Sequence, residues 1–362
     1  MNVFTLFSGY DSQYLALLRL ANQYDLPAKL SLVGWSEIDA AACAAHNALF
    51  PMLEKKNYGD VTKIDWHRVK ADIDLLTYSS PCQDFSFAGL RQGGEKGSGT
   101  RSSLLWDVER AIAVKRPKYL LMENVASLTS AKFLPTLHRW LRTLESYEYK
   151  NFAKVLNAKD YEVPQNRERL FVVSILDTSA KFYFPAPMPL KTRLKDILEN
   201  DVPQSYYLSE NTIARFDAHW LRNCPKMNRH GFGWHPSYGD GVASTLCVSG
   251  QDRSNDNYII TRGHGYVKGN EYSDHAPTVQ ASSFQHNAAV HQGMHIRRLT
   301  PRECFRLMDV DDESINLIQA AGISKTNQYK MAGNSIVVSV LYHIFRKMFV
   351  HTECETQQLE LF

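Results

Sequence analysis

Cys82 is the first residue whose type and position would allow it to do chemistry. It follows Pro81 in the stretch LLTYSSPCQDFSFAG, residues 75–89, where an apolar segment typical of a strand ends. A cysteine thiolate acts as a nucleophile or as a metal ligand. No second cysteine lies near enough in sequence to suggest a metal clip, and a lone buried cysteine is ordinarily an inert core residue. The rest of the sequence must therefore decide whether this thiol reacts.

Three other side chains lie at or just past the ends of predicted strands, namely Phe7, Glu37 and Glu123. In a mainly parallel sheet, ligands bind outside the carboxyl ends of the strands. Together with Cys82, this makes four functional side-chain types on one rim, which is more than chance placement would give. An acidic residue directly after a strand, as Glu37 is, can accept both hydroxyls of a ribose.

Two arginines lie further along the chain. Arg167 and Arg169 are two residues apart in VPQNRERLFVV, residues 163–173. In an extended strand, residues with this spacing point to the same face. A solvated strand face is the plain alternative to a functional pair.

Strands and helices alternate through the first half of the chain, and they must position these residues. Short, apolar segments predict strands at residues 2–7, 31–37, 73–80, 118–125, 151–158 and 169–176. Helical patterns lie between them at residues 12–21, 38–47, 103–115 and 134–145. This alternation predicts an α/β fold with a mainly parallel sheet covered on both faces.

The character of the sequence changes near residue 185. The stretch FPAPMP, residues 184–189, is typical of a linker. Residues 185–295 are rich in Gly, Ser, Asn, Tyr and Trp and hold eight of the thirteen histidines. Segments 242–249 and 275–282 are loosely similar, which suggests two hairpin arms. No HxH or HxxxH pair there is supported by nearby cysteines, so we expect no metal site.

Regular structure is expected to resume near Thr300. Thr300 suits an N-cap, Pro301 suits the first helical position, and Glu303 completes a capping box. A short strand is predicted over residues 258–260, and a final helix over residues 328–349.

The composition narrows the class of protein. The chain has 362 residues, of which 44% are hydrophobic, enough for a substantial core and for two domains. No apolar run approaches the roughly 20 residues of a membrane helix, and we expect no signal peptide. Six scattered cysteines without a CxxC pair indicate reduced thiols in a cytoplasm-like compartment. The net charge of +3 permits a nucleic-acid partner without demanding one.

A set of short stretches occurs in a fixed order along most of the chain: FTLFSGYDS, GWSEIDAAACAAHN, YGDVTKID, SSPCQDFSFAG, MENV, VPQNRERLFVV, IRRLTPRECFRLM and QYKMAGNSIVVSVLYHIF. Together they resemble the motifs of the DNA (cytosine-5-)-methyltransferase family. They match its cofactor motifs, its Pro-Cys motif, its Glu-Asn-Val motif and its Gln-x-Arg-x-Arg motif. Any one of them alone would be a weak signal, whereas the ordered set is a strong one.

The resemblance implies an α/β fold with a Rossmann-like, S-adenosylmethionine-dependent methyltransferase sheet and a smaller, irregular, β-rich target-recognition domain. We expect residues 1–184 and 327–362 to form a discontinuous catalytic, cofactor-binding domain. Residues 185–300 would form the target-recognition domain, and residues 300–326 the connection that returns to the catalytic domain.

The resemblance also implies a mechanism. Cytosine C5 is a poor nucleophile, and addition of a thiolate at C6 turns the ring into an enamine whose C5 can attack a methyl donor. Cys82 would be that nucleophile. Glu123 would hold a proton at N3 and accept from the exocyclic amine. Arg167 would meet the carbonyl oxygen, with Arg169 supporting it or sharing its role.

The implied cofactor is S-adenosyl-L-methionine. Glu37 would bind its ribose, Asp60 would accept from the adenine amine, and Val61 would pack against the ring. Asn334 and Ser335 would return from far along the chain to close the pocket. The full expected set is Phe7, Gly9, Asp11, Glu37, Ile38, Asp60, Val61, Pro81, Asn334 and Ser335.

The chain departs from the family pattern at Asp11. The family usually has F-x-G-x-G in its first loop, and Asp11 stands where the second glycine would be. Aspartate tolerates left-handed backbone better than most residues. Its carboxylate would either cap the helix starting near Ser12 or face the cationic end of the cofactor.

Double-stranded DNA is the expected substrate. A base inside a duplex hides C5 and C6, so it must be rotated out of the stack. Residues 185–295 offer side chains for base edges and phosphates. Thr278-Val279 resembles the family's Thr-Leu element, and Thr245-Leu246 is the competing match. The expected DNA contacts are Gln83, Ser86, Gln165, Thr278 and Arg298.

Two alternatives remain open on sequence alone. One is an RNA cytosine methyltransferase built on the same motifs, against which the length of region 185–295 argues. The other is a non-catalytic DNA-binding relative, against which Cys82, Glu123, Arg167 and Arg169 argue together. We expect a monomer in the cytoplasm of a prokaryote or encoded by a phage, with no membrane partner. A cognate restriction endonuclease, if there is one, would act separately.

Overall fold

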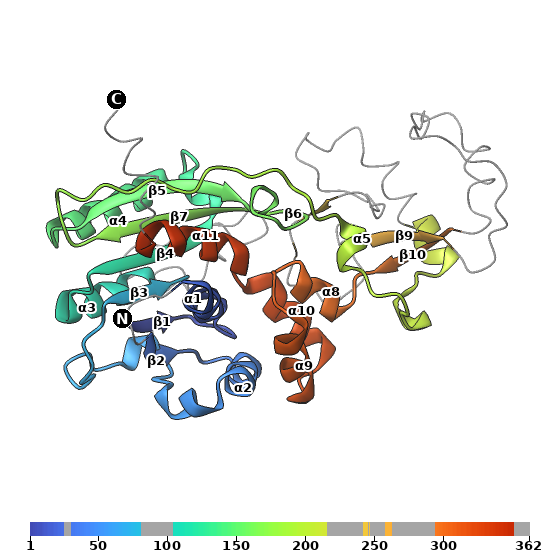
Figure 1. The fold of residues 1–362 in the computed structure, drawn as a ribbon, viewed down its shortest axis with the longest axis horizontal. Helices are drawn as coiled ribbons and strands as arrows, with labels where there is room; N and C mark the ends of the chain where they lie inside the picture. The colour runs from blue at the N-terminus through green and yellow to red at the C-terminus, as the bar shows by residue number, and fades with distance from the viewer. Residues whose placement is uncertain are drawn as a thin grey trace.

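The computed structural model describes residues 1–24, 30–80, 104–215, 242–244, 246, 258–262 and 294–350. Its centre is a six-stranded sheet in the order β2-β1-β3-β4-β7-β5 (Figure 1). These strands are β1 (Asn2–Leu6), β2 (Ser31–Ser36), β3 (Leu75–Tyr78), β4 (Tyr119–Val125), β5 (Lys150–Asn157) and β7 (Glu168–Ile175). Only β7 runs against its neighbours in this sheet, so the sheet is mainly parallel, as predicted.

Helices cover both faces of the sheet. One face carries α1 (Ser12–Gln23), α2 (Ala40–Leu49) and α11 (Val338–Phe349), and the other carries α3 (Leu105–Lys115) and α4 (Leu134–Ser146). Successive strand residues alternate between the two cores. Leu75 and Leu121 pack on the α1 side, while Leu76 and Leu120 pack on the α3 side. Burial on both faces explains why these strands are nearly continuous apolar runs.

The predicted bounds of these strands and helices agree with the structure to within two residues at each end. Local capping explains several of them. Asp39 caps α2 by accepting from Ala41 and Ala42 N–H. Helix α3 ends at Lys115, and its C-cap residue Arg116 adopts left-handed backbone directly before Pro117.

The C-terminal part is helical, with α8 (Pro301–Arg306), α9 (Asp312–Ala320) and α10 (Lys325–Asn334) ahead of α11. Thr300 caps α8 and Glu303 completes the capping box, as predicted. The single helix predicted over residues 328–349 is wrong, because the chain becomes extended at Ser335 and divides it into α10 and α11. The break leaves the backbone carbonyls of Gly333 and Ser335 available to accept hydrogen bonds from the side chain of Arg167.

The C-terminal helices share a core with the N-terminal half. Helix α11 packs against α1, and α9 packs against α2 (Figure 1). Phe305 of α8 and Ile315 of α9 belong to the same hydrophobic cluster as Leu17 of α1. The domain boundaries at residues 184 and 327 stay predictions.

Two small sheets lie beyond the main one. Strand β6 (Gln165–Asn166) pairs with β8 (Ala243–Ser244), and β9 (Tyr258–Arg262) pairs with β10 (Met294–Arg298). The strand predicted at residues 258–260 is thus confirmed as part of β9. A short helix, α5 (Leu194–Ile197), lies between β6 and β8 in sequence. Segment 275–282 lies outside the described residues.

Among the described residues, no helix has both the length and the apolar character needed to cross a bilayer.

Candidate functional site

The candidate site lies at the carboxyl edge of the parallel strands. Phe7 follows β1, Glu37 follows β2, and Glu123 lies near the end of β4. Because β7 runs in the opposite direction, its first residues lie at this same edge, and Arg169 stands opposite Val125 of β4. One reversed strand therefore brings an arginine to the rim where the other strands end.

Glu123 and Arg169 form an ion pair at this rim. Arg169 Nε lies 3.1 Å from Glu123 Oε1, and the two side chains are 17% and 9% exposed. Burial raises the pKa of Glu123, although the charges of Arg169 and Arg167 oppose the rise. The carboxyl therefore keeps its proton to a higher pH than an exposed glutamate would. Such a group suits a ring nitrogen that must receive a hydrogen bond or a proton.

Asn124 connects this pair to the chain that leads into the Pro-Cys stretch. Its Nδ2 donates to Ser80 O at 3.3 Å and to Ser80 Oγ at 3.4 Å. The described chain stops at Ser80, two residues before Cys82, so Cys82 lies outside the described residues. Sequence reasoning did not single out Asn124. The available signal was its place between Glu123 and Val125 in MENV.

Arg167 is buried, and its guanidinium binds backbone carbonyls. Its Nη2 donates to Gly333 O and Ser335 O, both at 2.9 Å, and its Nη1 donates to Leu246 O at 3.4 Å. It is 3% exposed. Two of these carbonyls lie at the break between α10 and α11, and the third follows β8. Arg169 is the arginine that forms an ion pair with Glu123, whereas the expectation was that Arg167 meets the carbonyl oxygen and Arg169 supports it or shares its role. The roles of the two arginines in the reaction stay predictions.

The expected DNA contacts fall in different places. Gln83, Ser86 and Thr278 lie outside the described residues. Gln165 is fully buried, where its Nε2 donates to Leu307 O at 2.7 Å and its Oε1 accepts from Leu246 N–H at 3.2 Å. A direct contact of Gln165 with DNA would require these bonds to break, so the structure gives it a place in the interior instead.

Arg298, the fifth expected DNA contact, is partly exposed at the end of β10. Its Nη2 donates to Ser205 O at 3.3 Å, and its guanidinium lies 6.0 Å from the ring centre of Tyr206. Lys325 lies over the same ring at 4.9 Å. Two cations therefore lie beside one aromatic ring near the β9–β10 sheet.

The loop after β1 has an unusual backbone. Phe7, Gly9 and Asp11 all have positive φ, at 54°, 59° and 70°. Positive φ is strained for a bulky residue such as Phe7, and such strain gathers at functional sites. The loop is tied to the next strand, because Gly9 N–H donates to Glu37 Oε2 at 3.0 Å.

Glu37 is ordered by its own loop. Its Oε1 accepts from Ile38 N–H at 2.7 Å and from Asp39 N–H at 2.8 Å. Ile38 directly beside it is 73% exposed, which is unusual for so apolar a side chain. A fixed carboxylate next to an uncovered apolar surface fits the ribose and base of a nucleoside.

Asp60 and Val61 lie nearby, after the β2–α2 unit. Asp60 Oδ1 accepts from Thr62 N–H at 3.0 Å and from Thr62 Oγ1 at 2.8 Å, and these bonds lower the pKa of Asp60. Asp60 is therefore an ionised acceptor at neutral pH. Val61 is buried next to it, and Arg110 Nη2 donates to its carbonyl at 2.9 Å.

Asp11 serves as the cap of α1. Its Oδ1 accepts from Tyr14 N–H at 3.0 Å, and its Oδ2 accepts from Thr5 Oγ1 at 2.7 Å. His46 Nε2 lies 3.5 Å from Oδ2, and its ring stacks on Trp35 with 3.6 Å between centroids. The carboxylate is fully buried. The capping interpretation is thus confirmed, and the alternative, a carboxylate facing the cofactor, does not fit this geometry.

We predict that Asp11→Gly changes cofactor affinity while leaving single-turnover methyl transfer within about tenfold, or roughly 1.4 kcal/mol. Glycine accepts the φ of 70° but removes the cap and the bond from Thr5. Asp11→Asn is the matched control, since it keeps a capping acceptor and loses the charge. Calorimetric cofactor titration and rapid-quench assays would measure the two quantities. A thousandfold loss of rate in Asp11→Gly at saturating cofactor would instead give the carboxylate a chemical role.

Asn334 and Ser335 come to the same rim from the far end of the chain. Both lie where α10 gives way to α11, with Asn334 exposed and Ser335 partly exposed. Tyr10 OH donates to Ser335 Oγ at 2.8 Å, which links this break to the loop after β1. Lys330 Nζ also pairs with Asp39 Oδ2 at 2.5 Å. The structure therefore brings both ends of the predicted pocket together.

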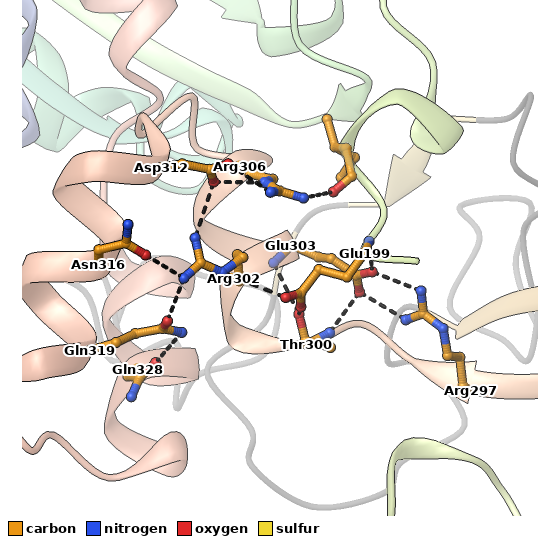
Figure 2. A network of polar contacts seen from close by, with 11 residues as sticks. Glu199, Arg297, Thr300, Arg302, Glu303, Arg306, Asp312, Asn316, Gln319 and Gln328 are labelled. Carbon is orange, nitrogen blue, oxygen red and sulfur yellow. Dashed lines mark hydrogen bonds and ion pairs between the residues drawn. The ribbon is translucent and has the colours of Figure 1, made fainter. Parts of the chain in front are cut away.

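A buried polar network joins the β9–β10 sheet to α8 (Figure 2). Arg297 makes a two-pronged pair with Glu303, at 2.8 and 2.7 Å, and both side chains are almost fully buried. Glu303 also accepts from Thr300 N–H and Glu199 N–H, both at 2.8 Å. All these groups are satisfied, so the pair fixes how the strand enters the helix. Removing one partner of such a pair typically costs 3–5 kcal/mol.

Comparison with known proteins gives a consistent result. The C-5 cytosine-specific DNA methylase family matches residues 1–350. The type II methyltransferase M2.ScrFI of Lactococcus lactis subsp. cremoris is 35% identical over 294 residues, covering 81% of this chain and 71% of that protein. The orphan methyltransferase M.SPRI of Bacillus phage SPR is 30% identical, covering 97% of this chain and 98% of that protein.

The fold also matches solved structures. The Dnmt2 methyltransferase of S. pombe superposes with a TM-score of 0.68 at 19% identity, covering 96% of this chain and 97% of that one. The methyltransferase EhMeth of Entamoeba histolytica superposes with a TM-score of 0.69 at 16% identity, covering the same shares. At these identities the likeness concerns the fold, which agrees with the predicted Rossmann-like methyltransferase architecture.

Proposed function

The chain belongs to the C-5 cytosine-specific DNA methylase family, and from this premise we propose that it transfers a methyl group from S-adenosylmethionine to C5 of a cytosine within a specific short DNA sequence. The observation that carries the proposal is the buried ion pair between Glu123 and Arg169. The neighbouring Asn124 binds Ser80, which directly precedes the Pro-Cys stretch. The carboxyl of Glu123, the guanidinium of Arg169 and Ser80, two residues before Cys82, therefore lie at one rim of the sheet.

In the proposed reaction, the Cys82 thiolate forms a bond to C6 of the cytosine. The ring electrons move toward N3, which takes a proton, and C5 becomes nucleophilic. After C5 has gained the methyl group, its proton passes to a base such as water, the electrons of that C–H bond form the C5–C6 double bond, and the thiolate leaves. N3 then returns its proton, which restores a neutral cytosine ring. Covalent catalysis of this kind replaces one difficult step by easier ones.

Glu123 and Arg169 would stabilise the ring as charge develops on it. The raised pKa of Glu123 favours a protonated carboxyl that donates to N3, while its other oxygen accepts from the exocyclic amine. Arg169, held 3.1 Å from Glu123, would meet the carbonyl oxygen of the base. Groups fixed in advance where charge appears supply much of an enzyme's rate enhancement.

The cofactor pocket would be formed by the strained loop after β1, by Glu37 with exposed Ile38, by Asp60, and by the break at Ser335. These residues fit S-adenosylmethionine, because Glu37 suits a ribose diol and the side chain of Ile38 is an uncovered apolar surface. When bound, that molecule supplies an electrophilic methyl group. The chain's own part is to bind it and orient it toward C5.

Rotation of the target base out of the duplex costs a few kcal/mol, which contacts to DNA must offset. We assign sequence reading to residues 185–300. Within this range Arg298 lies beside Tyr206, and Lys325 of α10 lies over the same ring. In cells this activity would mark DNA, with or without a separately acting restriction endonuclease.

A methylation assay separates the candidate functions. Purified protein would be incubated with methyl-labelled S-adenosylmethionine and either duplex DNA or tRNA, and modified positions would be mapped by sequencing. The proposal predicts 5-methylcytosine at one short motif in DNA. Transfer to tRNA alone would favour the RNA enzyme, and absence of transfer to both would favour a non-catalytic protein.

We further predict that sequence choice and chemistry separate along the chain. Replacing single Arg, Asn or Gln residues within 185–295 should relax the target at one base position, since each two-pronged base contact gives about 1–3 kcal/mol of discrimination. Substituting Arg169, which is paired with Glu123, should instead lower the rate on every sequence alike. Genome-wide maps of 5-methylcytosine for both sets would test this. A scan of residues 185–295 that never alters the methylated motif would contradict this division between sequence choice and chemistry.

A further inference from the structure

Tyr10 lies between Gly9 and Asp11 in the loop after β1, and its side chain is buried, with 1% exposed. Its hydroxyl donates to Ser335 Oγ at 2.8 Å. Its ring packs edge-on against Phe305, with 5.6 Å between centroids. Burial raises the pKa of Tyr10, so the hydroxyl remains a proton donor at any pH that suits the protein. The loop is thereby fastened to a residue 325 positions away.

The helix break at Ser335 is held from a second side by Arg167. Two carbonyls of the break, those of Gly333 and Ser335, accept from Arg167 Nη2. Ser335 Oγ in turn donates to Ala332 O at 3.1 Å. Several hydrogen bonds thus hold the backbone at the break. The hydroxyl of Tyr10 connects this break to the loop after β1.

We propose that Tyr10 is a positioning residue, whose hydroxyl sets Ser335, and with it the exposed Asn334, in the place that completes the cofactor pocket. This rests on the proposed function. A pocket wall fixed before binding lowers the entropy lost when a ligand is held. The same break is bonded to Arg167, which lies two residues before Arg169, the partner of Glu123.

The experiment is a double-mutant cycle on cofactor binding. Tyr10→Phe keeps the ring and its packing on Phe305 and removes only the donor. Calorimetry would give Kd for S-adenosylhomocysteine with the wild type, Tyr10→Phe, Ser335→Ala and the double variant. Loss of one hydrogen bond should raise the Kd of Tyr10→Phe by about threefold to tenfold. In the Ser335→Ala background, where the bond is already absent, adding Tyr10→Phe should change Kd by less than about twofold. The rate at saturating S-adenosylmethionine should change by less than about threefold, giving an effect on KM rather than on kcat.

Tyr161→Phe is the matched control. Tyr161 is equally buried, and its hydroxyl donates to Pro185 O at 2.9 Å, which belongs to no predicted pocket. It should lower Tm as Tyr10→Phe does and leave Kd unchanged. Equal Kd for wild type and Tyr10→Phe, an equal loss in the Ser335→Ala background, or the same loss in Tyr161→Phe would each overturn the positioning role. A wild type that fails to bind S-adenosylhomocysteine would overturn the proposed function as well, which distinguishes the two failures.

Discussion

DNA that carries 5-fluorocytosine at the target position will trap the wild-type protein as a covalent adduct, and Cys82→Ser will form none. The addition product must lose the C5 substituent as a cation before the thiolate can leave. A proton leaves readily in this way, whereas fluorine does not. Adduct formation should also require S-adenosylmethionine. Denaturing gel electrophoresis of protein mixed with labelled duplex would measure the yield, with unmodified cytosine as the DNA control.

Cys43→Ser is the matched protein control for this experiment. Burial, with a smaller contribution from the charge of Glu37, raises the pKa of the Cys43 thiol to about 11, so it remains an unreactive thiol at neutral pH. Its replacement should leave the adduct yield within about twofold, because only a thiolate attacks. An adduct of equal yield with Cys82→Ser, or one lost with Cys43→Ser instead, would show that Cys82 is not the nucleophile.

Most of the fold follows from local patterns in the sequence. The strands and helices of the N-terminal half are strongly apolar at the expected spacings and end at prolines or caps, so their positions could be predicted closely. The capping box from Thr300 to Glu303 is equally local, and the structure contains it. The direction of β7 could not be predicted in this way. It depends on which neighbour the strand pairs with, and that choice is made by tertiary packing.

The site shows the same division between local and long-range information. The two-residue spacing of Arg167 and Arg169 gave no means of telling which one meets Glu123. The difference arises because the helix predicted over 328–349 breaks at Ser335, and the exposed carbonyls take Arg167 into the interior. Gln165 is drawn inward for a similar reason, since Leu246 and Leu307 present backbone groups to it. Contacts between residues 80 to 170 positions apart leave no periodic signal in the sequence.

Asp11 shows how a departure from a family pattern can be resolved by geometry. The sequence offered a cap and a cofactor contact as alternatives. In the structure the positive φ expected of a glycine is retained, and the carboxylate turns to Tyr14 N–H and Thr5. A residue that tolerates left-handed backbone and accepts hydrogen bonds can therefore replace glycine while adding a buried polar contact between strand, loop and helix.

Arg169→Ala will slow methyl transfer on every DNA sequence by about a hundredfold to a thousandfold, the usual cost of removing one fixed group that stabilises developing charge. The loss should appear in single-turnover assays at saturating cofactor and DNA. The pH profile should change as well. The charge of Arg169 lowers the pKa of Glu123, so its removal raises that pKa further. If the protonated carboxyl is the active form, activity falls as pH rises through this pKa, and the alkaline limb will therefore move to higher pH in Arg169→Ala.

Arg167→Lys and Arg169→Lys are the paired controls, because each keeps a positive charge and loses the planar fork. Arg167 supports three backbone carbonyls, so Arg167→Lys should mainly lower Tm and raise the Kd for the cofactor. Arg169 faces Glu123, so Arg169→Lys should keep most of the wild-type pH profile while slowing the reaction. The assignment fails if the alkaline limb stays in place in Arg169→Ala, or if it moves further in Arg167→Lys than in Arg169→Ala. A larger shift in Arg167→Lys would mean that Arg167 sets the pKa of the Glu123 carboxyl. In either outcome, the distance of 3.1 Å between Arg169 and Glu123 would not describe the working site.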